Sequence, residues 1–343
     1  MMTTITSVTP RSRKIVLFSR QKLTLFTLLL LCTLLAIYGL GSGTLSLSPM
    51  QVIDALRGEG PHNLTVIVTQ WRLPRVAMAL ILGAALAASG AIFQSLMRNP
   101  LGSPDVIGFN TGAYSGVLVA IVLFNSSILG MTFGAMTGGL LTAVVVYLLA
   151  WRNGVETFRL IIVGIAVRAL LVAGNTWLVI SASLESALTA GLWSAGSLNG
   201  ITWAKSLPVV GLIILAWGLA LLLSRRMHLL EMGDDMARAL GVPVERSRLL
   251  LMLAGVALTA AATAVAGPIS FIALVAPQIA RRLCANQSQP LLIAGLTGAL
   301  LLLGADVATQ RLFLPYQLPV GVLTVCLGGI YLIGLLLRES RRK

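Results

Sequence analysis

The residue types that perform acid–base, nucleophilic or metal chemistry are few in this 343-residue chain and lie far apart. The two histidines, His62 and His228, have no nearby partner at a metal-binding spacing. The three cysteines (Cys32, Cys284 and Cys326) are too widely separated to indicate a disulfide framework or a metal-binding pair. The chain has no Gly-Lys dipeptide, hence no P-loop, and neither GxSxG nor HExxH occurs. The sequence therefore predicts a chain with no catalytic residues, no metal site and no cofactor of its own.

The most polar segment is Glu231–Arg248, EMGDDMARALGVPVERSR, which lies between two apolar runs. Asp234 and Asp235 suit the first turn of a helix, and Gly241 followed by Pro243 suits its end. We therefore expect a short helix within this loop. An ordinary solvated loop is the alternative to a docking helix that transmits force from a cytoplasmic partner.

Two arginines stand close together in Trp71-Arg72-Leu73-Pro74-Arg75, just before an apolar run, and Arg311 falls on the same side of the membrane in the topology below. Long cationic side chains at such positions often extend into the membrane interface. Arginine also pairs with carboxylates through two parallel hydrogen bonds, so recognition of an external acidic partner is the second interpretation.

Arg168 lies in the middle of an apolar run, where an arginine costs about 2.5–3.5 kcal/mol on insertion scales. It should therefore face a partner or a cavity, and Asp306, deep in a late apolar run, is the candidate partner. A structural ion pair and a role in a substrate path both remain open. Asn175 is expected on roughly the opposite face of the same helix, so one cavity would not explain both residues.

The composition indicates a membrane protein. Hydrophobic residues make up 57% of the chain and charged residues 10%, against about 25% charged in soluble domains. This excludes a soluble enzyme, a disordered protein and a secreted disulfide scaffold. The net charge of +14 would suggest nucleic acid in a soluble protein, but here it fits cationic loops beside a lipid bilayer.

Five cationic residues precede an apolar run at 23–40, which is long for the core of a signal peptide and suits a first transmembrane helix. Runs that span or nearly span a bilayer follow at 76–93, 106–124, 131–151, 160–180, 207–223, 249–266, 268–280, 291–308 and 319–337. The runs at 106–124 and 268–280 are weak because they are polar or broken by proline. Irregular backbone at membrane depth needs surrounding protein or a water-filled cavity, so we expect both inside the bundle.

The cationic residues support this count of about ten transmembrane helices in an all-α polytopic fold. With the N-terminus inside, 19 of the 25 Lys and Arg residues fall on the cytoplasmic side, five fall outside, and Arg168 falls within a span. We therefore expect a cytoplasmic segment at 1–22, one transmembrane domain at 23–337 with a cytoplasmic loop at 225–248, and a cytoplasmic tail at 338–343.

A faint internal repeat accompanies the topology. One constant shift along the sequence superimposes Ala87, Gly90, Ile92 and Pro100 on identical residue types at positions 264, 267, 269 and 277. The two segments run in opposite directions, as in the inverted repeats of transporters, although four such matches also arise by chance.

Several motifs together resemble a known family. They are WRLPRVAMALILGAALAASGAIFQSLMRNPLGSPDVIGFNTGA, the EMGDDMARALGV loop, AGPISFIALVAPQIARR and LPYQLPVGVLTVCLGGIYLIGLLL. In this order they resemble the iron-siderophore and vitamin B12 ABC-importer permeases over nearly the whole chain, and most of all those that transport ferric enterobactin.

The resemblance implies a type II importer permease of ten helices with both termini inside, in the bacterial inner membrane. It also implies a second permease that is homologous to this chain but different from it, a pair of ATPase subunits that bind the ATP and Mg²⁺, a periplasmic siderophore-binding protein and a path without a high-affinity pocket. The site residues carried over by motif position are Glu231, Gly233, Asp234, Asp235 and Gly241 for coupling to the ATPase, Arg72 and Arg75 for docking of the binding protein, and Glu156, Thr157 and Phe158 for the cytoplasmic gate. Two further residues are expected from their positions alone, Arg311 beside the docking arginines and Arg168 on the path. The family's third docking arginine aligns with Gln310, beside Arg311.

The function implied is alternating-access import of a ferric siderophore, with ferric enterobactin as the expected cargo. Another chelate (a hydroxamate siderophore, citrate, haem or cobalamin) is the alternative. An ion-coupled secondary transporter would need proton-relaying residues in the spans, where only Arg168 and Asp306 are ionisable. A membrane enzyme would need a catalytic cluster, which the sequence does not show.

Overall fold

The computed structural model describes residues 11–43, 45–152, 154, 156–284, 290–313 and 317–340, and these ranges form helices and no strand. Residues 1–10 of the expected N-terminal segment and 341–343 of the expected tail lie outside the described residues. The helices are α1 (Arg11–Gly41), α2 (Pro49–Arg57), α3 (His62–Val66), the π-helix η1 (Ile67–Arg72), α4 (Leu73–Met97), α5 (Phe109–Val122), α6 (Ile128–Ala150), α7 (Thr157–Ser181), α8 (Leu184–Ser194), α9 (Trp203–Glu231), α10 (Asp234–Ala239), α11 (Val244–Ala266), α12 (Ile272–Cys284), α13 (Leu291–Leu312) and α14 (Val320–Ser340).

All ten predicted spans fall on helices, namely α1, α4, α5, α6, α7, α9, α11, α12, α13 and α14. Seven helical segments in the described ranges are long and apolar enough to cross a bilayer. The other three are α5, with 14 residues, α12, with 13, and α14, whose apolar part is Val320–Leu335. The two weak spans of the sequence are thus the two shortest helices of the ten, and α4 packs against α12 while α6 packs against α5, so both lie in the bundle as expected.

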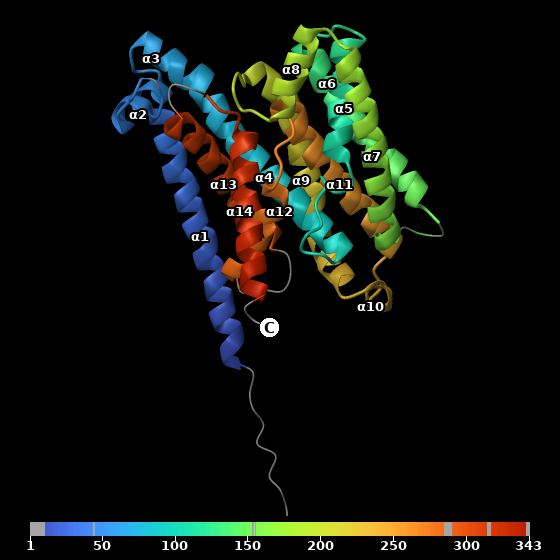
Figure 1. Cartoon of the computed structure of the whole chain (residues 1–343). Coiled ribbons are helices and arrows are strands. Elements are labelled where there is room, and N and C mark those ends of the chain that lie inside the picture. The colour runs from blue at the N-terminus through green and yellow to red at the C-terminus, as the bar shows by residue number, and fades with distance from the viewer. Residues whose placement is uncertain are drawn as a thin grey trace, which may run out of the picture.

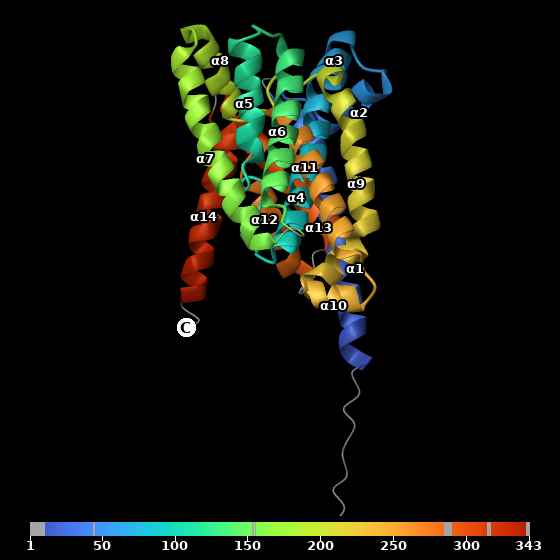
Figure 2. The same cartoon turned by 90° about the vertical axis from the view of Figure 1, so that its right-hand side faces the viewer.

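The long helices lie side by side with their axes roughly aligned, and the short helices lie at the two ends of this bundle (Figure 1). The helix expected in the polar loop exists as α10, and it lies at the same end as the start of α1 and the end of α14 (Figures 1 and 2). The opposite end carries α2, α3 and α8, three short helices that the sequence did not suggest. The segment from α3 through η1 to α4 is continuous, and Pro74, which cannot donate to the helix ladder, is the second residue after the π-helical turn.

The inverted repeat is visible in the order and packing of the helices. Helices α5, α6 and α7 begin at positions 109, 128 and 157, and helices α12, α13 and α14 begin at 272, 291 and 320, so one constant offset relates all three pairs. The leading helix of each half is the one before its set of three, α4 in the first half and α11 in the second. These two helices run in opposite directions, because α4 begins at the end of the molecule that carries α3, whereas α11 begins at the end that carries α10 (Figure 1). Each leading helix packs into the other half: α4 against α12 and α13, and α11 against α5 and α6.

The four residue matches behind the predicted repeat are not equivalent positions. Gly90 lies inside α4, whereas Gly267 is the residue that ends α11. Pro100 lies in the connection after α4, whereas Pro277 lies inside α12. The shift taken from these four matches was therefore wrong, although the repeat itself exists.

The core is built around α4, α11 and α13, most of whose apolar windows are buried, while α1 and α7 are mostly exposed. Gly83 and Gly298 allow α4 and α13 to approach closely, since an added Cβ on either residue would collide with the backbone of the other. Gly116 and Gly134 do the same between α5 and α6. Small residues are the usual means of close helix packing in membranes, where apolar burial alone gives no advantage over lipid.

Candidate functional site

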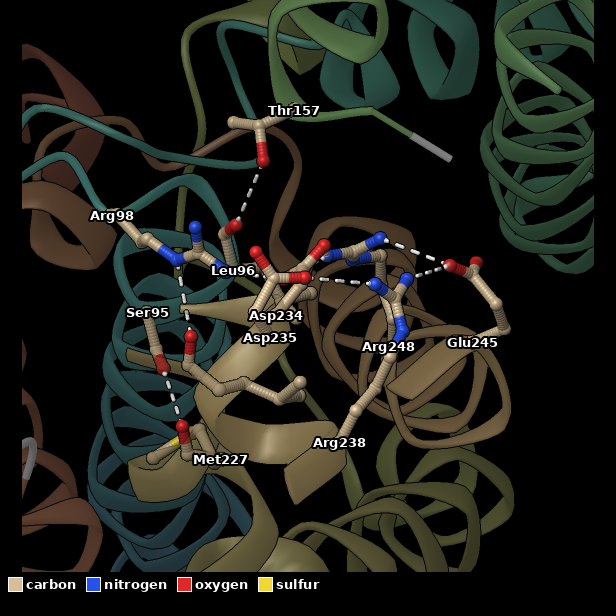
Figure 3. Close-up of polar contacts among 11 residues, drawn as sticks. Ser95, Leu96, Arg98, Thr157, Met227, Asp234, Asp235, Arg238, Glu245 and Arg248 are labelled. Atoms are coloured by element: carbon tan, nitrogen blue, oxygen red, sulfur yellow. Dashed lines mark hydrogen bonds and ion pairs between the residues drawn. The ribbon is translucent and has the colours of Figure 1, made fainter. Parts of the chain in front are cut away.

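Helix α10 is held against the bundle by a cluster of charges centred on Asp234 (Figure 3). The Arg248 Nη2 group, from α11, donates to both carboxylate oxygens of Asp234 at 2.8 Å. The Arg98 Nη2 group donates to the same carboxylate from the end of α4. Asp234 therefore connects three elements that lie far apart in the sequence.

The electrostatics keep Asp234 ionised. Partial burial opposes its charge, but hydrogen bonds and charges from Arg248 and Arg98 outweigh burial and leave the pKa of Asp234 below its ordinary value. Arg248 is itself buried, with 8% of its surface exposed, and its second ion pair goes to Glu245 at 3.6 Å. A buried arginine that lost these partners would leave an uncompensated charge.

Arg98 is a residue that sequence reasoning placed only among the cytoplasmic cations. It ends α4 in the left-handed region with φ +48°, where a non-glycine residue costs about 1–2 kcal/mol. Its Nε donates to the Leu230 carbonyl at 3.0 Å, and the neighbouring Ser95 hydroxyl donates to the Met227 carbonyl at 3.3 Å. The only sequence signal was an arginine just before Asn-Pro, where a helix must end.

The other residues expected in the coupling loop surround this cluster. Glu231 is the last residue of α9, and Gly233 and Gly241 flank α10 with φ of +112° and +78°, which favour glycine. Asp235 is fully exposed and pairs within α10 with Arg238 at 3.3 Å. The expected residues therefore do surround one helix, and Asp234 is the one that attaches it.

The expected gate residues begin α7, next to the same end of α4. Glu156 is the N-cap residue of α7 and pairs with Arg159 at 3.0 Å. The Thr157 hydroxyl donates to the Leu96 carbonyl at 3.3 Å (Figure 3), and Phe158 is exposed. The last turn of α4 thus contacts α7 through Leu96 and α10 through Arg98.

Arg168 lies near the middle of α7 and faces a cavity of about 450 Å³. Asn175 lines the same cavity, so the expectation that the two residues face opposite ways was wrong. Their separation along α7 is roughly two helical turns, which places both on one face. The remaining polar groups of the wall include Asp105, Asn110 and Tyr114.

Asp306 is not the partner of Arg168, which corrects the second expectation about this arginine. Arg75 binds both oxygens of Asp306, at 2.9 and 2.8 Å, and Gln310 donates to the same carboxylate at 2.8 Å. Asp306 is 1% exposed, so this is a buried ion pair that joins α4 to α13.

Arg72 and Arg311 approach the connection between α1 and α2 from two helices. Arg72 donates to the carbonyls of Leu40 at 2.8 Å and Leu45 at 2.5 Å, and the Arg311 Nε donates to the Ser42 hydroxyl at 2.7 Å. In the described part of the chain neither arginine pairs with a carboxylate, so both retain a positive charge at this end. Of the three predicted docking arginines, only Arg75 has its charge balanced.

Both the sequence and the fold match those of known proteins. A model of the FecCD transport family matches residues 28–338, nearly the whole chain. The chain belongs to the FecCD transport family. A solved chain described as an inward-facing conformation of a metal-chelate type ABC transporter superposes with a TM-score of 0.82 at 30% identity, covering 92% of this chain and 98% of that one.

Curated FecCD-type relatives span the same length. The ferric enterobactin transport system permease protein FepG of Escherichia coli (strain K12) is 64% identical, over 94% of this chain and 98% of the relative. The achromobactin transport system permease protein CbrC of Dickeya dadantii (strain 3937) is 38% identical, over 96% and 94%. The hemin transport system permease protein HmuU of Yersinia pestis is 36% identical, over 94% and 98%. The chain is therefore a membrane-spanning permease of this family, as its motifs predicted.

Proposed function

We propose that the chain is the permease subunit of an ATP-driven importer that moves ferric enterobactin from the periplasm to the cytoplasm across the bacterial inner membrane. The observation that carries the cargo is the 64% identity with the ferric enterobactin permease over almost the full length of both chains. Relatives at 38% identity or below carry the names of other chelates, among them achromobactin and hemin, so only the higher identity points to one cargo.

Energy has to come from a partner, because the chain contains no P-loop with which to hydrolyse ATP. We assign ATP and Mg²⁺ to a pair of ATPase subunits that dock on α10, which makes the α10 end cytoplasmic, as the positive-inside bias also predicts. A second, homologous permease completes the path. The exposed apolar faces of α7 and α14 are surfaces on which such a subunit can pack.

The coupling route follows from the contacts of α4. A force on α10 reaches Arg98 through Asp234, and it reaches Arg248 on α11 through the same carboxylate. The last turn of α4 is in turn hydrogen-bonded to Thr157, at the start of α7, where we place the cytoplasmic gate. Closure of the ATPase pair would thus move α10, α4 and the start of α7 together and reopen the path between the two permeases.

At the opposite end, we propose that the periplasmic binding protein docks through carboxylates. Arg72 and Arg311 have carbonyl and hydroxyl partners, which leave their charges available to an acidic surface. Arg75 directs two of its donor groups to buried Asp306, so its contribution is to hold α4 and α13 in register below the docking surface.

Uptake of radiolabelled iron as ferric enterobactin tests the proposal, in a strain deleted for this gene and in the same strain with the gene restored. Ferric hydroxamate, ferric citrate, haem and cobalamin serve as parallel substrates. We expect that uptake of ferric enterobactin alone is lost and that the restored gene recovers it. If uptake of a different substrate alone were lost, that substrate would be the cargo. An uncoupler applied while ATP stays high should leave uptake intact; abolished uptake would indicate an ion-coupled transporter instead.

A further inference from the structure

The polar cavity on α7 contains a cation that makes no direct polar contact with another described residue. In the described part of the chain, the Arg168 guanidinium makes neither a hydrogen bond nor an ion pair, and its side chain is exposed. A charged residue at this depth is costly unless it meets water, a partner or a ligand. The position of Arg168 thus indicates a ligand or a partner protein that approaches from the exposed side of α7.

The shape of the surroundings favours a ligand over a flat protein contact. The space beside Arg168 measures about 450 Å³, which falls within the usual range of ligand pockets, about 300–1,000 Å³. Its wall comes from α5 and the connection before it, from α7, from the end of α8, and from Pro268 and Ser270 in the non-helical stretch that precedes α12. Irregular backbone is expected at membrane depth only beside protein or a polar cavity, which fits this arrangement.

Hydrogen-bonding groups line the wall around the guanidinium. Asn110, Tyr114, Asn175 and Thr176 contribute amide and hydroxyl groups. Asn175 is 6% exposed and is fixed by donating to the Thr111 carbonyl at 3.4 Å, and the Asn110 side chain accepts from Thr263 at 2.9 Å. The wall is therefore held in place before any ligand arrives.

The cavity also contains one acid, Asp105. Asp105 is partly buried as a residue, and its carboxylate lies inward, accepts a hydrogen bond from Asn110 and attracts Arg168 without a direct hydrogen bond to it. Arg168 is the more exposed of the two, so a ligand that enters from the open side meets the positive charge first.

We infer that Arg168 and the polar wall around it form a transit half-site for one anionic, oxygen-rich arm of the chelate, with the other half supplied across the path. This inference rests on the proposed function and names the group of the cargo that the α7 face receives. A cavity of about 450 Å³ receives one part of a large chelate, and a site open on one side binds briefly rather than tightly. Weak binding suits a path, because a cargo held tightly at this point would not leave.

Charge-selective labelling in the assembled importer tests the half-site directly. Thr176→Cys is introduced into a background in which the three native cysteines are replaced, and its modification rates by an anionic and a cationic methanethiosulfonate are compared. One positive charge at roughly 10 Å in a water-like dielectric favours the anionic reagent over the cationic one by about fourfold. We expect that preference with Arg168 present, its loss in Arg168→Gln, its retention in Arg168→Lys, and slower labelling when ferric enterobactin is added.

Three outcomes would overturn the half-site. Equal labelling rates for the two reagents with Arg168 present, or no protection by ferric enterobactin, would show that Arg168 does not contact the chelate. A cysteine that neither reagent reaches, together with loss of permease pairing in Arg168→Gln, would show that Arg168 meets the second permease instead.

Transport gives an independent readout. Arg168→Gln should slow ferric enterobactin uptake about tenfold or more, as expected for one charge-assisted hydrogen bond, and Arg168→Lys should recover most of it. The matched control is Arg152→Gln, which removes an exposed cation outside the cavity and should leave uptake unchanged. Normal uptake in Arg168→Gln would contradict the half-site alone, whereas no ferric enterobactin uptake by the unaltered importer would contradict the proposed function.

Discussion

Replacing Arg98 with glutamine should disconnect α10 from α4 without unfolding the bundle. The change removes the ion pair between Arg98 and Asp234 and the hydrogen bond from Arg98 to the Leu230 carbonyl. The Arg98 side chain is 40% exposed and the Asp234 side chain 30% exposed. A partly exposed ion pair contributes about 0.2–1 kcal/mol and a backbone-directed hydrogen bond about 0.5–1.5 kcal/mol. The sum, about 0.7–2.5 kcal/mol, corresponds to roughly a 3- to 70-fold shift toward a state in which the end of α9 and α10 are detached from α4.

The assay is the ratio of cargo moved to ATP hydrolysed in proteoliposomes that contain the complete importer. We expect Arg98→Gln to lower this ratio several-fold while basal ATPase activity and complex assembly persist, because Arg248 still binds Asp234. Arg238→Gln is the matched control, since its i,i+3 partner Asp235 is fully exposed and its contact with Glu245 is long, at 3.9 Å, so both pairs contribute little.

A double-mutant cycle with Asp234→Asn separates the proposed contact from indirect effects. The two substitutions together should cost less than the sum of each alone, because both break the same ion pair. Additive effects, or an unchanged ratio in Arg98→Gln, would refute transmission through Arg98.

The other predictions concern the remaining charges. Asp306→Asn leaves Arg75 without its buried partner and should destabilise the permease by about 3–5 kcal/mol, measured as a lower unfolding temperature in detergent; an unchanged temperature would contradict the importance of this pair. Arg72→Glu with Arg311→Glu should weaken binding-protein affinity at least tenfold with basal ATPase activity intact, and normal affinity would move the docking surface elsewhere. Because the pKa of Asp234 is depressed, its stabilisation of α10 is complete above the ordinary aspartate value of about 3.8 and is lost only as pH falls through the folded value. Protease sensitivity of the α10 loop should therefore stay flat between pH 5 and 8, and a rise within that window would refute the assignment.

The sequence predicted what depends on local pattern. Hydropathy located ten helices, and helix start and stop signals located α10 from Asp234 to the glycine and proline that follow it. Motif position brought Glu156, Thr157 and Phe158 to the start of α7, next to the end of α4.

What failed depended on contacts between distant segments. Asp306 was matched to Arg168 because both are ionisable in apolar runs, but pairing is set by which helices meet, and α13 meets α4. Arg98 was overlooked because its importance comes from Leu230 and Asp234, which lie in a distant part of the sequence. The repeat was found at the wrong offset because helix packing, rather than residue identity, preserves it.

The exchange of leading helices between the two halves constrains how the chain is made. Helix α4 is largely buried, and much of what covers it is α13, which ends at Leu312, whereas α4 ends at Met97. At about 5–20 residues per second, ribosomes need roughly 10–40 s to synthesise the chain between these two ends. During this interval α4 has to wait in the membrane with Gly83 and its other packing positions uncovered, beside the translocon or a chaperone. A ribosome that stalled before α13 would release a chain whose central helix has no place to pack, and such a chain is a substrate for membrane proteases rather than a half-sized permease.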